Sequence, residues 1–249
     1  ATNSLSGVIL LNSWKLVNWI SFEILCGKYF EALRNLRFIF EGCVHAVVIE
    51  DIIESQIWER WQSLSSITLK AEIFKLWEIC KSEKVYDYKK RKVRKRKVKE
   101  IVKNFVEDLG FSSEEKREHI EVYTKILSQQ GLYIPTGAMI QRCCELLRIE
   151  EEKENLKQLW HELSRYQHFS YPYLEVACEK PEYIFLEMFD KEMFELSLEL
   201  YFKTMDFLYA VIAWRFPQLR KRVKEVCKWW NNFGKPFHLA EKVIKKVMS

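Results

Sequence analysis

Apolar residues recur along most of this chain at steps of three and four, the spacing that places them on one face of a helix. Glycine and proline, which are common in the turns between β-strands, occur only seven and five times in 249 residues. The pattern therefore predicts an all-α protein, built as a multi-helix bundle around a hydrophobic core.

Two stretches, residues 29–53 and 190–214, are apolar on nearly every side. A helix with this pattern is buried within a bundle, whereas a surface helix has one polar face. We therefore expect two long buried helices at the centre of the fold. Local signals also mark helix starts: Asp190 is placed to cap the second stretch, and Ser112 with Glu115 three residues on forms a capping box.

The chain is predicted to be a single helical domain, residues 1–249, with a hinge near residues 82–97 that separates subdomains 1–82 and 98–249. The hinge is placed where the apolar stripe fails, because Val93 is the main apolar residue in a long polar stretch. A helix without an apolar stripe has nothing to pack against. A projecting basic helix and a loop both fit this pattern.

Positive charge is concentrated in the same part of the chain. Nine of the eleven residues from 89 to 99 are Lys or Arg and none is acidic, so we name residues 89–99 the basic segment. The formal net charge of the whole chain is +5, and removing these nine charges leaves −4 for the rest. The sequence thus describes a mildly acidic body with one intensely basic stretch. The nine cations are Lys89, Lys90, Arg91, Lys92, Arg94, Lys95, Arg96, Lys97 and Lys99.

Neighbouring cations repel one another unless a polyanion neutralises them. RNA or another polyanion is therefore the expected partner, and Tyr86 and Tyr88 beside the basic segment are placed to stack on unpaired bases. The alternatives are a solvated loop, a nuclear-targeting signal and a contact with anionic lipid. Because no strongly apolar face accompanies the cations, we expect no membrane binding.

Four ionisable residues form a stripe on the first long helix. Arg34, Arg37, Glu41 and His45 follow at steps of three, four and four, which stacks them on one side. A buried charge must be paired, so we expect a buried polar cluster that also includes Ser164 from a later helix. The favoured interpretation is structural, and the alternative is a catalytic cleft. The candidate catalytic residues are Arg37, Glu41, His45 and His168.

A resemblance follows from these residues. The Arg-x-x-x-Glu pair Arg37 and Glu41, followed by Leu-Ser-x-x-x-His at residues 163–168, resembles prokaryotic helical proteins related to the HEPN superfamily. The similarity covers residues 29–55 and 155–215 and implies a helical bundle. Many HEPN proteins are dimeric ribonucleases with Arg-x4–6-His on one helix. Here seven residues separate Arg37 from His45, so the resemblance implies the bundle and not the catalysis.

Other chemistry is disfavoured by the sequence. It has no Gly-rich phosphate loop, nucleophile elbow or HExxH, and its seven cysteines include no CxxC pair. We therefore expect no metal and no cofactor. Unpaired cysteines in apolar helical contexts suit a reducing cytoplasm. The apolar residues 8–11 are followed by Asn12, Lys15 and Asn18, a pattern that fits neither a signal peptide nor a membrane span.

The sequence therefore predicts a cytoplasmic RNA-binding protein, with structured or ribosomal RNA as a candidate ligand. The first alternative is a HEPN-like ribonuclease or toxin-like enzyme, with the catalytic candidates meeting in one cleft at the interface of a homodimer. The second alternative is a protein-interaction scaffold, whose aromatic residues would dock a partner.

Overall fold

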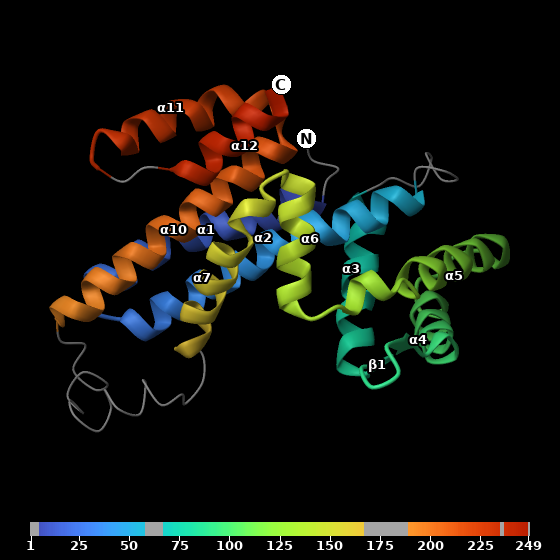
Figure 1. Cartoon of the computed structure of the whole chain (residues 1–249). Helices are drawn as coiled ribbons and strands as arrows, with labels where there is room; N and C mark the ends of the chain where they lie inside the picture. The colour runs from blue at the N-terminus through green and yellow to red at the C-terminus, as the bar shows by residue number, and fades with distance from the viewer. Residues whose placement is uncertain (1–4, 58–66, 167–188, 235–236, 249) are drawn as a thin grey trace. The chain divides into compact units, whose positions relative to one another are not determined.

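A computed structural model describes residues 5–57, 67–166, 189–234 and 237–248 (Figure 1). Over these ranges the chain forms ten α-helices, three short 3₁₀ helices and one hairpin of two short strands. The predicted all-α, multi-helix architecture is confirmed. The α-helices are α1 (Leu5–Leu25), α2 (Tyr29–Ile57), α3 (Ile67–Ser82), α4 (Lys95–Glu107), α5 (Ser113–Leu127), α6 (Thr136–Leu147), α7 (Lys153–Arg165), α10 (Lys191–Arg215), α11 (Arg220–Asn231) and α12 (His238–Met248).

The remaining elements are short. Strands β1 (Tyr86–Asp87) and β2 (Lys92–Val93) pair antiparallel, with Tyr86 opposite Val93. The 3₁₀ helices are η2 (Gln130–Tyr133), η3 (Glu150–Glu152) and η4 (Pro217–Leu219).

The chain divides into two compact units. The first comprises residues 1–5 and 48–138, and the second comprises residues 6–47 and 139–249. Residues 82–97, where the sequence suggested a hinge, lie inside the first unit.

The first unit is built on α3, α4 and α5, which pack against one another. On α4 the buried residues Val98, Val102 and Val106 recur every four positions, so one side of a very polar helix is apolar. Trp77 of α3 is fully buried, and its indole N–H donates to the carbonyl of Leu132 at 2.8 Å. Buried tryptophans need such a partner for the indole N–H, which fixes the ring in one orientation.

Helix α5 begins at the capping box that the sequence predicted. The Ser112 hydroxyl accepts from the backbone N–H of Glu115, and the Glu115 carboxylate accepts from the backbone N–H of Ser112 at 2.9 Å. Two amides that the first turn leaves without partners are satisfied in this way. The start of α5 is thereby fixed by local sequence alone.

The second unit contains most of both long helices, the first part of α2 and all of α10. Phe40 of α2 and Phe207 of α10 bring their ring centroids to 5.0 Å. From Thr204 to Val211 every residue of α10 except Tyr209 is buried. The predicted cap is present as well, since the Asp190 carboxylate accepts from the backbone N–H of Met193 at 3.0 Å. The two long helices are present, and burial in α10 is concentrated in its second half, since Glu195, Glu199 and Lys203 in its first half are exposed.

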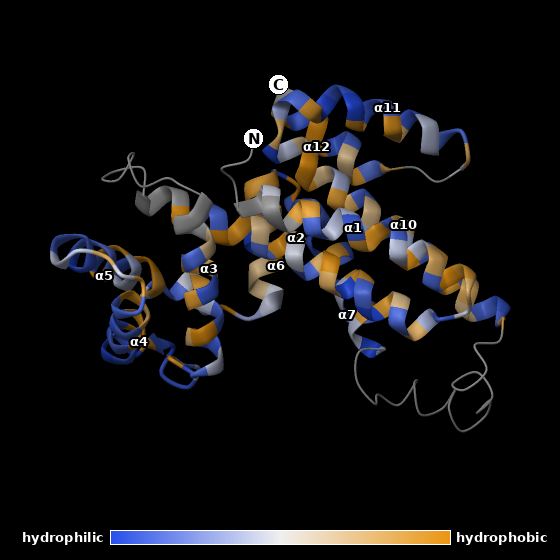
Figure 2. Ribbon diagram, turned by 180° about the vertical axis from the view of Figure 1, so that it is seen from behind, coloured by the Kyte–Doolittle hydropathy of each residue, from blue (hydrophilic) through white to orange (hydrophobic). Residues whose placement is uncertain are grey.

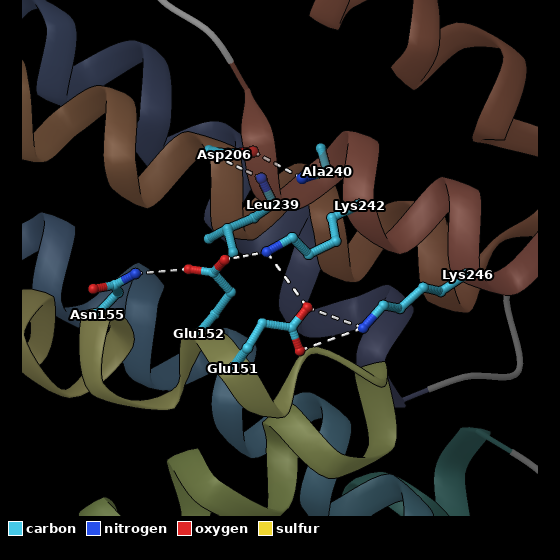
Figure 3. A network of polar contacts seen from close by, with 8 residues as sticks. All are labelled: Glu151, Glu152, Asn155, Asp206, Leu239, Ala240, Lys242 and Lys246. Atoms are coloured by element: carbon cyan, nitrogen blue, oxygen red, sulfur yellow. Dashed lines mark hydrogen bonds and ion pairs between the residues drawn. The ribbon is translucent and has the colours of Figure 1, made fainter.

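A carboxylate of α10 holds the start of α12 in the second unit (Figure 3). The two carboxylate oxygens of Asp206 accept from the backbone N–H groups of Leu239 and Ala240, each at 2.9 Å. Burial outweighs these hydrogen bonds and raises the pKa of Asp206 to about 6. If α12 began at another residue, both hydrogen bonds to Asp206 would be lost, so Asp206 fixes where this helix begins.

Ion pairs fasten the same helix to η3 (Figure 3). Glu152 pairs with Lys242, and Glu151 pairs with Lys246 at 3.0 Å and with Lys242 at 3.4 Å. A backbone hydrogen bond within Glu151 and the Lys246 ammonium lower the pKa of the Glu151 carboxyl to about 2.

None of the helices in the described ranges combines the length and apolar composition needed to cross a bilayer.

Candidate nucleic-acid interface

The basic segment consists of the hairpin turn, strand β2 and the first turns of α4. Residues 88–91 connect β1 to β2, and α4 begins at Lys95 (Figure 1). The sequence predicted either a projecting helix or a loop for this segment, and the structure combines a turn with the start of a helix. A turn displays the first cations and a helix displays the last.

Asp87, an acid just before the basic segment, shapes the turn. One carboxylate oxygen accepts from the backbone N–H groups of Lys89 and Lys90, both at 3.1 Å. An Asp side chain that accepts from backbone amides two and three residues ahead forms an Asx turn, which stabilises the bend of the chain at that point. The other oxygen lies 3.7 Å from Arg94. The Lys90 amide is the largest cause that lowers the pKa of Asp87, so the carboxylate stays charged.

Three contacts fasten the segment to residues 83–85, which follow α3. Val93 is only 2% exposed, and the backbone N–H of Arg94 donates to the carbonyl of Val85 at 2.8 Å. The Lys97 ammonium lies 2.7 Å from the carbonyl and 3.0 Å from the carboxylate of Glu83. The backbone of the basic segment is thus held in place by the buried side chain of Val93 and by the contacts of Arg94 and Lys97.

The other seven cations point to solvent. Their side chains are exposed, and none forms an ion pair with a carboxylate in the described part of the chain. Of the nine cations, Arg94 and Lys97 are the two that have an ion pair among the described residues. The seven are Lys89, Lys90, Arg91, Lys92, Lys95, Arg96 and Lys99.

The start of α4 favours an anion. Its first three residues, Lys95 to Lys97, are all cations, and Arg94 before them provides no side-chain cap. Positive side chains oppose the helix dipole at this end, where free backbone N–H groups bind anions. A groove of about 460 Å³ lies beside it and is lined by Asp87, Lys90, Lys92, Val93, Arg94, Lys95 and Arg96.

The two tyrosines differ in what they can contact. Tyr86 stacks on Tyr133 with ring centroids 5.9 Å apart and makes a T-shaped contact with Tyr88 at a centroid distance of 4.9 Å. Tyr88 is 66% exposed. Both tyrosines were predicted to stack on bases, and Tyr88 is the one whose ring is open to solvent.

The polar stripe of α2 is less buried than expected. Arg34 is exposed, so the prediction that it is buried is wrong. The reason is helical phase, since Glu31, Arg34 and Phe38 share the solvent side of α2 at steps of three and four. Arg37, Glu41, His45 and Ser164 are half-buried.

The structure brings part of the stripe together with a tryptophan. One oxygen of Glu41 accepts from Arg37 Nε at 2.9 Å and from Trp160 Nε1 at 3.0 Å. The Arg37 guanidinium lies 5.9 Å from the Trp160 ring centroid. These contacts tie α2 to α7, a role that sequence reasoning had not given to Trp160.

The other members of the stripe add less. The Ser164 hydroxyl donates to the carbonyl of Trp160 at 2.5 Å and so bonds its own helix. His168 lies outside the described residues. Of the four candidate catalytic residues, Arg37 and Glu41 pair with each other on α2 and both contact Trp160 of α7.

Sequence reasoning missed the contribution of α5. Arg117 and Lys125 of this helix line a second groove together with Lys95 and Lys99 of α4. Acidic residues are interspersed along α5, so no run of charge reveals these two cations. Figure 2 shows α4 and α5 as largely hydrophilic ribbons with apolar residues between them.

Comparisons with protein-family models, with curated proteins and with solved structures each found no match to this chain. No group of three or more His, Cys, Asp or Glu side chains suited to a metal ion occurs within the described ranges. The function must therefore be argued from the geometry of the interface itself.

Proposed function

We propose that this protein binds RNA through the basic segment. The observation that carries the proposal is the display of seven exposed cations that have no ion pair among the described residues, on a backbone held by Asp87, Val93 and Lys97. Phosphates would remove the mutual repulsion of these cations and occupy the open amides at the start of α4. The rest of the chain has a net charge of −4, which disfavours RNA binding over most of the remaining surface.

Counterion release gives the proposal a quantitative form. If about six cations meet phosphates, the logarithm of affinity falls against the logarithm of salt concentration with a slope on the order of −5 for duplex RNA, and about −4 for a single strand. A stacking or hydrogen-bonding interaction without phosphates would have a slope near zero.

A pair of variants with equal charge tests the proposal. The hairpin variant replaces Lys89, Lys90, Arg91 and Lys92 with Gln. The α11 variant replaces Lys221, Arg222, Lys224 and Lys228 with Gln, which removes four exposed cations from the second unit. Affinity for labelled RNA, both a single strand and a stem-loop, is measured by fluorescence anisotropy from about 50 to 200 mM salt, the range over which binding to phosphates weakens strongly.

We expect the hairpin variant to bind RNA more than tenfold more weakly and to reduce the slope by about 3, since each phosphate that is no longer neutralised removes about 0.7. The α11 variant should remain within about twofold of the wild type, because its cations lie elsewhere. Equal losses in the two variants would show a response to net charge alone. Unchanged binding by the hairpin variant would end the proposal.

One observation favours the scaffold as a second candidate. Helix α1 exposes Leu11, Trp14, Phe22 and Leu25, with exposed fractions from 45% to 75%, on one helical face. A second copy of the chain is the partner we propose for this face, since the same apolar face on two copies can pair about a twofold axis. Replacing Leu11 and Leu25 with Ser should abolish a dimer in sedimentation equilibrium, and a wild-type monomer at all concentrations would refute it.

A further inference from the structure

A second groove lies between α4 and α5, beyond the hairpin. Its volume is about 570 Å³, and the two helices that form it pack directly on one another. Four cations line it: Lys95 and Lys99 from α4, and Arg117 and Lys125 from α5. Glu121 is the one acid in the lining, so the groove is strongly positive.

Two hydroxyls in the lining lack partners. Thr124 and Ser128 are one turn apart on α5, and their side-chain oxygens are buried without a hydrogen bond in the described structure. A helical Thr or Ser commonly donates to the carbonyl four residues back, as Thr204 does to Leu200. A buried hydroxyl without a hydrogen bond is destabilising, so the presence of two such hydroxyls beside four cations indicates an acceptor that the chain itself does not supply.

We infer that the α4–α5 groove is a phosphate site that seats a backbone phosphate of the bound RNA strand. Lys99, Arg117 and Lys125 supply charge, and the hydroxyls of Thr124 and Ser128 donate hydrogen bonds. This inference rests on the proposed function and extends it. The strand runs from the hairpin across the start of α4 to α5, because Lys95 lines both grooves.

The opposing charges are outweighed. Glu121 and the carboxyl end of α5 both repel an anion, the latter because helix carbonyls carry partial negative charge. Four full positive charges exceed one full negative charge and this partial charge. Arg117 also offers a planar fork of donors that suits two phosphate oxygens.

The test uses the full chain with an intact basic segment. The groove variant carries Arg117→Gln and Lys125→Gln. Its control carries Lys103→Gln and Lys116→Gln, which removes two cations from the same two helices outside the groove. The salt dependence of binding to a single-stranded RNA is measured for each.

We expect the groove variant to reduce the slope by about 1.4, at about 0.7 for each cation that no longer meets a phosphate, and to weaken binding about tenfold at 0.1 M salt. The control should keep the wild-type slope. A groove variant indistinguishable from its control would overturn the inference, while the proposed function would still stand if the hairpin variant failed to bind RNA.

A variant without the two hydroxyls distinguishes a direct role of these groups in RNA binding from a role in folding. Thr124→Val with Ser128→Ala should weaken RNA binding about threefold to tenfold and leave the urea midpoint unchanged or higher, because unpartnered hydroxyls are removed. Unchanged RNA affinity would rule the hydroxyls out as donors.

Inorganic phosphate identifies the source of the anion. Phosphate line width in ³¹P NMR is measured with the wild type and the groove variant. Millimolar or weaker phosphate binding that disappears in the groove variant, combined with the reduced salt slope for RNA, supports an RNA phosphate. Tight phosphate binding that persists in the presence of saturating RNA would show a site for a free anion and overturn the inference.

Discussion

Asp87 organises the turn that displays the first cations of the basic segment. Its carboxylate bonds two backbone amides of the turn and faces Arg94. The sequence predicts the density of cations, since nine in eleven residues is evident on inspection. It does not predict that one acid organises them, because an Asp turn depends on backbone angles that neighbouring side chains do not specify.

The exposure of Tyr88 makes it the residue to test for base stacking. Tyr88→Ala should weaken single-stranded RNA binding by about 1–3 kcal/mol, roughly fivefold to a hundredfold, whereas Tyr88→Phe keeps the ring and the affinity. Fluorescence anisotropy with a single strand and with a fully paired duplex measures both. If the alanine variant binds the single strand as the wild type does, the ring does not stack on a base.

Glu41 is a second residue with a sharply defined role. Glu41→Ala leaves Arg37 and Trp160 without their shared acceptor and should lower the free energy of unfolding by about 1–2 kcal/mol, since both donors are partly reached by water. Urea denaturation measures this change. Glu195→Ala, which removes a weak surface pair on α10, is the control and should cost no more than about 0.5 kcal/mol. Equal decreases would show that the contact between α2 and α7 contributes nothing special.

Among the elements, periodic helices were predictable and the hairpin was not. The apolar spacing of Val98 and Val102 predicts the packed side of α4, and Ser112 with Glu115 predicts the start of α5. Strands of two residues have no period to detect. Val93 looks isolated in the sequence, yet only 2% of its surface is exposed in the folded chain.

Helix α12 should respond to pH through Asp206. Burial raises its pKa to about 6, whereas the unfolded chain restores a value near 3.8. The native state therefore binds this proton more tightly. The stabilisation is complete below about pH 4 and disappears as the pH rises through about 6.

The variant Asp206→Asn does not titrate at this position. Comparing it with the wild type separates the pH dependence due to Asp206 from that of the η3 carboxylates, which are present in both proteins. Between pH 4 and 7 the difference in unfolding free energy should shift by about 2.5 kcal/mol in favour of the variant, from about two pKa units. Urea denaturation at each pH measures it. Parallel profiles would mean that Asp206 titrates normally in the native state.

For the whole molecule, charge is distributed so that folding and binding conflict. The chain is mildly acidic outside the basic segment, which gathers nine cations. This balance was readable from the sequence. The division into two units was not, because it depends on contacts between residues distant in the chain: the second unit joins residues 6–47 to residues from 139 onward.

The hairpin variant should show the conflict directly. With four mutually repelling cations replaced by Gln, it should unfold at the same or a higher temperature than the wild type at low salt, by up to a few degrees. The difference should shrink as salt screens the charges, with a Debye length of about 3 Å at 1 M. Scanning calorimetry at low and high salt measures both. A hairpin variant that is less stable at low salt would show that the cations support the fold.

The turn of the hairpin holds Arg91 at a φ of 47°, in the left-handed region. Glycine and asparagine enter this region at lower conformational cost than arginine, by about 1 kcal/mol. A library randomised at position 91 and sorted for heat resistance should accordingly drift toward those two residues. The same library sorted on immobilised RNA should keep a long basic side chain.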